Sequence, residues 1–101
     1  KTMKRLEAAG WKIGDASDFL GLSPEETAFI ELKLALSRSI RHEREKQGLT
    51  QTALAKLLES SQSRVAKMEG ADSSVSIDLM IRSLLALGAS PEDLADVISS
   101  S

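Results

Sequence analysis

The sequence predicts an all-α protein in which five helices follow a helical N-terminal arm, and three observations support this prediction. Proline-led caps and glycines divide the chain into segments of helical length. Within those segments apolar residues recur every three or four positions, and no segment alternates as a strand would. Only three residues are aromatic, one Trp and two Phe. The core must therefore be built from Leu, Ile, Val, Ala and Met, which suits packed helices better than a sheet.

Residues 1–22 form the predicted arm. Glycines at positions 10, 14 and 21 interrupt it, so we expect a short helix before the first glycine and one or two turns from Asp15 to Leu20. Trp11 is the only tryptophan and has two interpretations. It either anchors a partner or docks the arm on the rest of the chain, and the second role is the more common one for such a residue.

Residues 23–98 are predicted to hold the five helices. The first follows Ser23-Pro24-Glu25-Glu26, a capping box with proline at the first helical position. This helix should run to about Gln47, where Gly48 provides a left-handed end. Its apolar positions recur at helical spacing and are Phe29, Leu32, Leu36 and Ile40.

Two short helices follow within residues 51–69. Thr50 can cap the first, Ser60 or Ser61 can cap the second, and Gly70 can end it. Two short helices joined by a tight turn build a poor core but are well suited to entering a DNA groove. The internal positions of this pair are Leu54, Leu58, Val65 and Met68.

The last two helices follow a polar loop at residues 71–75. Ser76 starts one of them, Gly88 ends it, and Ser90-Pro91-Glu92-Asp93 is a proline-led cap for the other. The apolar positions of both are Ile77, Met80, Ile81, Leu84, Leu85, Leu94, Val97 and Ile98. Because one small core leaves some of these side chains in need of cover, we expect the two helices to form a dimer surface.

The charge is distributed unevenly along the chain. The formal net charge is -2, but residues 33–67 hold eight Lys or Arg and three Glu, a net of +5. The other residues hold five basic and twelve acidic groups, a net of -7. A basic middle between acidic ends is compatible with binding a polyanion, and equally with a solvated helix face that is basic.

Several classes of function are disfavoured by the composition. The chain has no cysteine and one histidine, His42, which we expect to be exposed. It has no glycine-rich phosphate loop and no Ser-His-acid grouping, so we predict no enzyme activity, no metal and no cofactor. No apolar run approaches the roughly 20 residues that span a bilayer, and no secretory signal is visible. These features fit a cytoplasmic protein.

The outward face of the second short helix consists of Gln62, Ser63, Arg64 and Lys67. Glutamine and arginine carry paired polar groups that match purine edges in the major groove of DNA. We therefore interpret this face as a DNA-reading face, and the alternative is an ordinary solvated helix face.

The run LTQTALAKLLESSQSRVAKMEG, residues 49–70, resembles the helix-turn-helix of the Xre/Cro/phage-repressor class of bacterial regulators. The resemblance extends without a gap from about Arg41 to Gly70, and more loosely to Gly88. It implies a lambda-repressor-like DNA-binding domain that acts as a homodimer on double-stranded operator DNA. Two recognition helices would then read half-sites about 34 Å apart, which is one turn of DNA.

The resemblance also implies roles for five side chains. Gln51 corresponds to a glutamine that contacts a backbone phosphate and packs beside the glutamine at Gln62. Gln62, Ser63 and Arg64 correspond to base-reading positions at the start of the recognition helix. Lys67 corresponds to a position that reaches either a base or a phosphate.

Three further positions correspond to the scaffold of that class. Arg44 and Glu69 match a partly buried ion pair that ties the first helix to the recognition helix. Glu59 stands where the family usually places a glycine with positive φ, a conformation that should cost glutamate about 1 kcal/mol. Either Glu59 accepts the strain, or the turn has shifted by a residue with the help of Ser60 and Ser61.

The arm, from Gly10 to Glu26, resembles a subgroup of these regulators that includes HigA-type antitoxins. Such proteins bind a ribosome-dependent, RNA-cleaving toxin of the RelE/HigB type and repress their own operon. Two functions follow from the resemblance. One is a dimeric transcriptional repressor, which includes phage and developmental regulators without a toxin. The alternative is an antitoxin whose main role is to neutralise its toxin, with acidic ends that wrap a basic partner.

Overall fold

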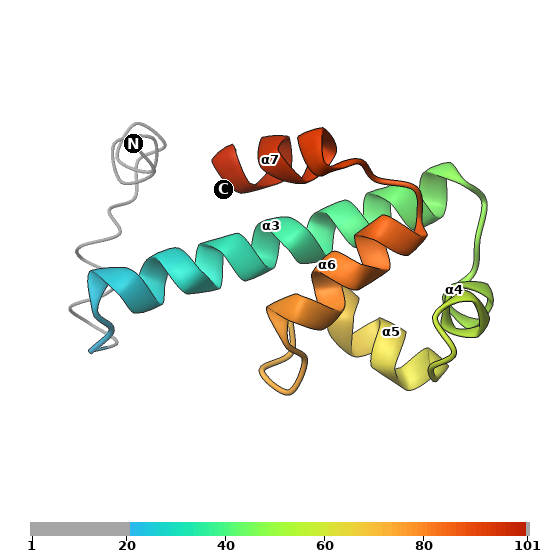
Figure 1. Cartoon of the computed structure of the whole chain (residues 1–101). Helices are drawn as coiled ribbons and strands as arrows, with labels where there is room; N and C mark the ends of the chain where they lie inside the picture. The colour runs from blue at the N-terminus through green and yellow to red at the C-terminus, as the bar shows by residue number, and fades with distance from the viewer. Residues whose placement is uncertain (1–20, 101) are drawn as a thin grey trace.

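The computed structural model describes residues 21–100, which contain helices and no strand (Figure 1). The five helices of this range are α3 (Pro24–Lys46), α4 (Gln51–Leu57), α5 (Gln62–Glu69), α6 (Ile77–Ala86) and α7 (Pro91–Ser99). The predicted all-α class is therefore confirmed, and each of the five helices lies where the sequence placed it. The helices expected within the arm, and Trp11, lie outside the described residues.

Hydroxyl side chains cap all five helices, as predicted. The Ser23 hydroxyl accepts a hydrogen bond from the Glu26 amide at 3.1 Å, and the Glu26 carboxylate accepts one from the Ser23 amide at 2.9 Å. These two bonds complete the capping box of α3. The residues that cap the other four helices are Thr50, Ser61, Ser76 and Ser90. Ser61, and not Ser60, thus sets the start of α5 at Gln62.

The turn between α4 and α5 contains Glu59 with a φ of 53°. The Glu59 amide donates to the Lys56 carbonyl at 3.1 Å, and the Ser60 amide donates to the Ala55 carbonyl at 2.8 Å. This is the pattern of a Schellman motif whose left-handed position is Glu59. Of the two alternatives, the first is therefore correct: Glu59 accepts the strained conformation and the turn has not shifted.

One core forms where α3 crosses the other helices. α3 packs against α5, α6 and α7, and α4 packs against α5. In Figure 1, α7 and α5 lie on opposite sides of α3. The apolar side chains that are at most 1% exposed are Leu36, Ile40, Leu54, Val65, Met68, Met80 and Leu84. Each stabilises the fold by about 1.5–3 kcal/mol relative to leaving it in water.

The apolar faces predicted from periodicity are buried in most but not all positions. Among the predicted internal positions of α4 and α5, Leu58 is only half-buried, although its side chain packs against the core. Phe29, Leu85 and Ile98 are exposed by 54%, 46% and 44%. Periodicity identifies the side of a helix that faces the core, but it does not say how far the neighbouring helices cover that side.

Candidate nucleic-acid interface

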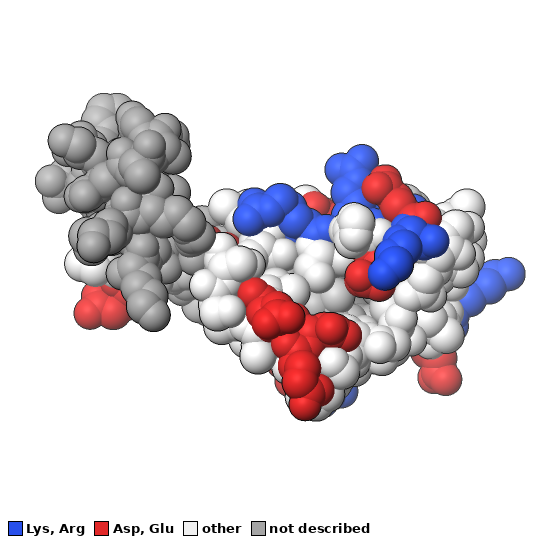
Figure 2. Space-filling model, turned by 90° about the horizontal axis from the view of Figure 1, so that it is seen from above, with Lys and Arg blue, Asp and Glu red and all other residues white. Residues whose placement is uncertain are grey.

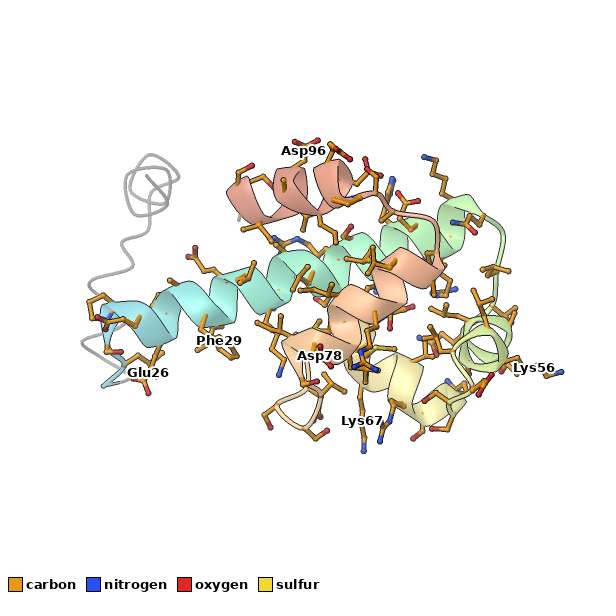
Figure 3. The ribbon with its side chains drawn as sticks, viewed as in Figure 1. Glu26, Phe29, Lys56, Lys67, Asp78 and Asp96 are labelled. Atoms are coloured by element: carbon orange, nitrogen blue, oxygen red, sulfur yellow. The ribbon has the colours of Figure 1, made fainter. Side chains whose placement is uncertain are left out.

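α5 has an anchored face and a free face. Val65 and Met68 are 0% exposed, so the helix cannot turn about its axis without uncovering the core. The side chains on its free face are all exposed and are Gln62, Ser63, Arg64 and Lys67. In Figure 3, Lys67 points away from the body of the domain. The structure thus brings four of the five predicted site residues together on one open face, and Gln51 lies next to them.

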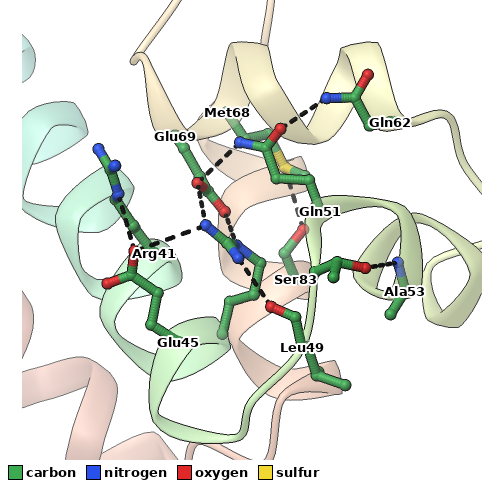
Figure 4. A network of polar contacts seen from close by, with 11 residues as sticks. Arg41, Glu45, Leu49, Gln51, Ala53, Gln62, Met68, Glu69 and Ser83 are labelled. Carbon is green, nitrogen blue, oxygen red and sulfur yellow. Dashed lines mark hydrogen bonds and ion pairs between the residues drawn. The ribbon is translucent and has the colours of Figure 1, made fainter.

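An ion pair between the side chains of Arg44 and Glu69 joins α3 to α5, and the dashed lines that reach Glu69 in Figure 4 mark its polar contacts. The guanidinium of Arg44 donates through Nε and Nη2 to the carboxylate of Glu69, the second bond at 3.0 Å. A third donor, Nη1, bonds the Leu49 carbonyl at 2.8 Å. The side chains of Arg44 and Glu69 are 11% and 4% exposed. The predicted ion pair is confirmed, and it links α3, the segment before α4, and the end of α5.

The ion pair changes the protonation behaviour of both partners. Burial by itself raises the pKa of Glu69, but the hydrogen bonds from Arg44 and Gln51, together with the charge of Arg44, leave this pKa below its ordinary value. The hydrogen bond with Glu69 raises the pKa of Arg44. Both groups are therefore ionised at neutral pH, and Glu69 can accept hydrogen bonds but cannot donate one.

Two amides connect Glu69 to the free face of α5. Gln51 Nε2 donates to Glu69 Oε1 at 3.1 Å, and Gln51 Oε1 accepts from Gln62 Nε2 at 2.6 Å. Because an ionised carboxylate only accepts, the NH₂ of Gln51 must face Glu69 and its oxygen must face Gln62. The network thereby fixes the orientation of the Gln62 amide. Among the described residues, Oε1 and one N–H of Gln62 remain available for another partner.

A hollow of about 550 Å³ lies between α5 and the start of α6. Arg64 and Lys67 line it from α5, and Ser74, Ser76 and Arg82 line it from the other side. Ser74, Ser76 and Arg82 are not among the site residues that the sequence predicts. Residues 71–75 are predicted as a polar loop and Ser76 only as a cap, and Arg82 falls outside the basic segment. These residues lie beside α5 only because of how α6 packs. A serine-rich loop before a helix with an arginine in it is nevertheless a sequence signal that could have identified them as candidate site residues.

Metal-binding and membrane-spanning features are absent from residues 21–100. Nowhere in this range do three His, Asp or Glu side chains gather as they would around a metal ion. None of its helices is both long and apolar enough to cross a bilayer. His42 is exposed, as expected.

Comparison with known proteins identifies one family. The model of the family described as helix-turn-helix domain matches residues 18–92, which is 75 of the 101 residues. The matched range contains the whole of α3, α4, α5 and α6 and the start of α7. No curated protein and no solved structure matches the chain. Helix-turn-helix domains bind DNA with the second helix of the motif, and they are typical of transcription regulators and not of enzymes. The chain belongs to the helix-turn-helix domain family.

Proposed function

We propose that this protein is a dimeric transcriptional repressor of the Xre/Cro/phage-repressor kind that binds specific sequences in double-stranded operator DNA. The observation that carries the proposal is the free face of α5. Gln62, Ser63, Arg64 and Lys67 are exposed on a helix that is anchored in the core by Val65 and Met68, which are both 0% exposed. A rigid helix is needed because hydrogen bonds to base edges require the donor and acceptor to meet within about 3 Å.

Three residues of this face supply groups that can read bases. The hydrogen bond from Gln62 to Gln51 leaves the Gln62 amide with one acceptor and one donor, the pair that matches the N6 amino group and N7 of adenine. Arg64 offers parallel N–H groups that match O6 and N7 of guanine. The hydroxyl of Ser63 can pair with either purine. We assign base contacts to these three side chains.

The other polar groups around α5 are assigned to the DNA backbone. Lys67 lines the hollow beside α5 together with Ser74, Ser76 and Arg82. The Arg82 guanidinium also pairs at 3.2 Å with the carboxylate of Asp78, which lines the same hollow, and both side chains are exposed. Gln51 stands at the start of α4, where it can contact a phosphate on the other side of the recognition helix. Phosphate contacts position a protein on the duplex without carrying sequence information. They also make binding depend steeply on salt.

Dimerisation through α6 and α7 would allow one protein to read two half-sites. Leu85 of α6 and Ile98 of α7 are exposed apolar side chains, and a second copy is the natural cover for them in a symmetric dimer. The two α5 helices would then enter successive major grooves about 34 Å apart. A dimer seated on an operator excludes other proteins from the same DNA, which is the basis of repression.

The test of this proposal uses a duplex that the full chain selects from a random pool. Arg64→Ala should weaken binding to that duplex by about 1–3 kcal/mol, roughly 5- to 150-fold, and relax the preference at one base pair. Lys56→Ala is the matched control, because Lys56 is an exposed cation of α4 that points in a different direction from Lys67 in Figure 3. Equal affinities for Arg64→Ala and the unsubstituted chain, or equal losses in the two variants, would refute the assigned role.

A second candidate function, the neutralisation of a basic RNA-cleaving toxin, is favoured by the charge of α7. Glu92, Asp93 and Asp96 are all exposed, and α7 has no basic residue. In Figure 2, which views the molecule from above Figure 1, acidic side chains gather in a patch. Because α7 lies across α3 from α5, a basic protein could bind α7 while α5 contacts DNA.

Co-purification from the native cell separates the two candidate functions. An antitoxin should carry a small basic protein with it, and this protein should be lost when the three acidic residues of α7 are replaced by their amides. Purification without such a partner, together with tight binding to the selected duplex, would favour the repressor.

A further inference from the structure

The apolar stripe of α3 extends beyond the core. Leu36 and Ile40 on this stripe are 0% exposed, whereas Phe29, which lies two helical turns before Leu36 on the same side, is 54% exposed. Ile30 and Leu34 are exposed by 43% and 40%. Figure 3 places Phe29 on the side of α3 where α5 and α6 lie, but beyond the ends of both helices. The other described helices therefore leave Phe29, Ile30 and Leu34 largely uncovered.

The uncovered surface is termed the Phe29 face and consists of Leu22, Phe29, Ile30 and Leu34. A shallow hollow of about 340 Å³ lies on it, lined by three of these apolar residues and by Glu25 and Glu26. Large contiguous apolar patches on monomeric proteins often mark a surface where something binds. We therefore expect another segment or molecule to bind the Phe29 face.

The composition of residues 1–20 suits that role. Two of the three aromatic residues of the protein, Trp11 and Phe19, are in this segment, and the third is Phe29 itself. Of these three, Phe29 is the one that the structure describes, and it lies outside the buried core of residues 21–100. The segment also contains other apolar side chains, which are Met3, Leu6, Ile13 and Leu20. It thus holds several large apolar side chains, which are the kind that can cover an exposed apolar surface.

Position and charge favour residues 1–20, and not a second copy of the chain, as the occupant of the Phe29 face. Residues 1–20 join the described chain at Gly21, directly before Leu22 of the Phe29 face. Trp11 lies ten positions before Gly21. Ten positions span about 15 Å even if they are helical, which matches the rise from Pro24 to Leu34. Residues 1–20 have four basic and three acidic groups, whereas residues 21–34 have three acidic and one basic. A second Phe29 face would instead bring glutamates against glutamates, which is unfavourable.

We propose that residues 1–20 of the same chain cover the Phe29 face, with Trp11 among the side chains that pack there. The segment thereby completes the core at the N-terminal end of α3.

Trp11 is the natural probe for the experiment because it is the only tryptophan. In the full chain its fluorescence should be blue-shifted and weakly quenched by acrylamide. The double variant Phe29→Ser, Ile30→Ser should shift the emission to the red and raise the quenching constant at least two-fold. Leu57→Ser is the matched control, because Leu57 is a 53% exposed apolar residue on α4, and it should change neither quantity.

Three results would overturn the proposal. A tryptophan that is fully accessible in the unsubstituted chain would mean that the Phe29 face is open to another protein. Quenching that increases several-fold on dilution would mean that a second copy covers it. Emission that is the same in the double variant would mean that Trp11 packs elsewhere.

An NMR measurement on the unsubstituted chain keeps the proposal testable if the double variant does not fold. Nuclear Overhauser effects should connect the Trp11 indole protons to Phe29, Ile30 or Leu34. Their absence, in spectra that resolve these side chains, would contradict the proposed contact.

Discussion

Arg44→Ala should lower the free energy of unfolding by about 3–5 kcal/mol, the usual loss when one partner of a buried ion pair is removed. The contacts in the structure give a similar range. The variant loses both hydrogen bonds from Arg44 to a carboxylate that is 4% exposed. At about 1.5–3 kcal/mol for a bond to a charged group, these two bonds account for about 3–6 kcal/mol. Of the donors in the described network, Gln51 alone would remain for Glu69.

The assay is urea denaturation followed by far-ultraviolet circular dichroism, with Arg41→Ala as the control. Arg41 pairs with Glu45 at 3.4 Å, but both side chains are more than half exposed. Removing such a pair should cost no more than about 0.5 kcal/mol. Since 1 kcal/mol shifts the Tm of a domain of this size by about 4–8 °C, the two variants should also melt more than about 10 °C apart. A loss in Arg44→Ala as small as that in Arg41→Ala would refute the idea that this pair holds α5 against α3.

Three further predictions concern the turn, the pH and the salt. Glu59→Gly should raise the free energy of unfolding in urea by about 1 kcal/mol, because glycine adopts a φ of 53° without a Cβ clash; a decrease would argue against strain at this position. Folding lowers the pKa of Glu69, so the stability that this carboxylate adds is present above its unfolded pKa and is lost as the pH falls through its folded pKa. Below about pH 5 the unsubstituted chain should therefore lose more stability than Glu69→Gln, and parallel pH profiles would contradict this. Arg82→Ala should reduce the slope of log affinity against log salt by about 1 with the same sequence preference, and an unaltered slope would show that Arg82 neutralises no phosphate.

The starts of the helices could be predicted from the sequence because a cap joins residues only three apart. The Ser61 hydroxyl and the Arg64 amide, 3.1 Å apart, set the first residue of α5. Once that residue is known, helical geometry alone assigns Gln62 and Lys67 to the free face and Val65 to the core.

The conformation of the helix ends was harder to predict. α5 ends at Gly70 as expected, but the residue with positive φ is Ala71, at 52°. Glu59 likewise takes a left-handed conformation in place of a glycine. In both turns the packing of the helices on either side determines the path of the chain, and it overrides the preference of the single residue.

Contacts between distant parts of the chain depended on the family resemblance or were missed. Arg44 and Glu69 are 25 positions apart, and no local pattern pairs them. Arg82 reaches the hollow beside α5 only through the packing of α6. Phe29 shares the periodicity of the buried stripe, yet its exposure depends on where the neighbouring helices end.

The central claim is that the free face of α5 contacts DNA, and NMR mapping tests it most directly. Backbone amide shifts of the full chain would be followed as the selected duplex is added, with an unrelated duplex as the control. We expect the largest changes at residues 62–67, with smaller changes at Gln51 and around Ser74 and Ser76. Changes centred on α7, or the same pattern and affinity with both duplexes, would contradict sequence-specific binding by α5.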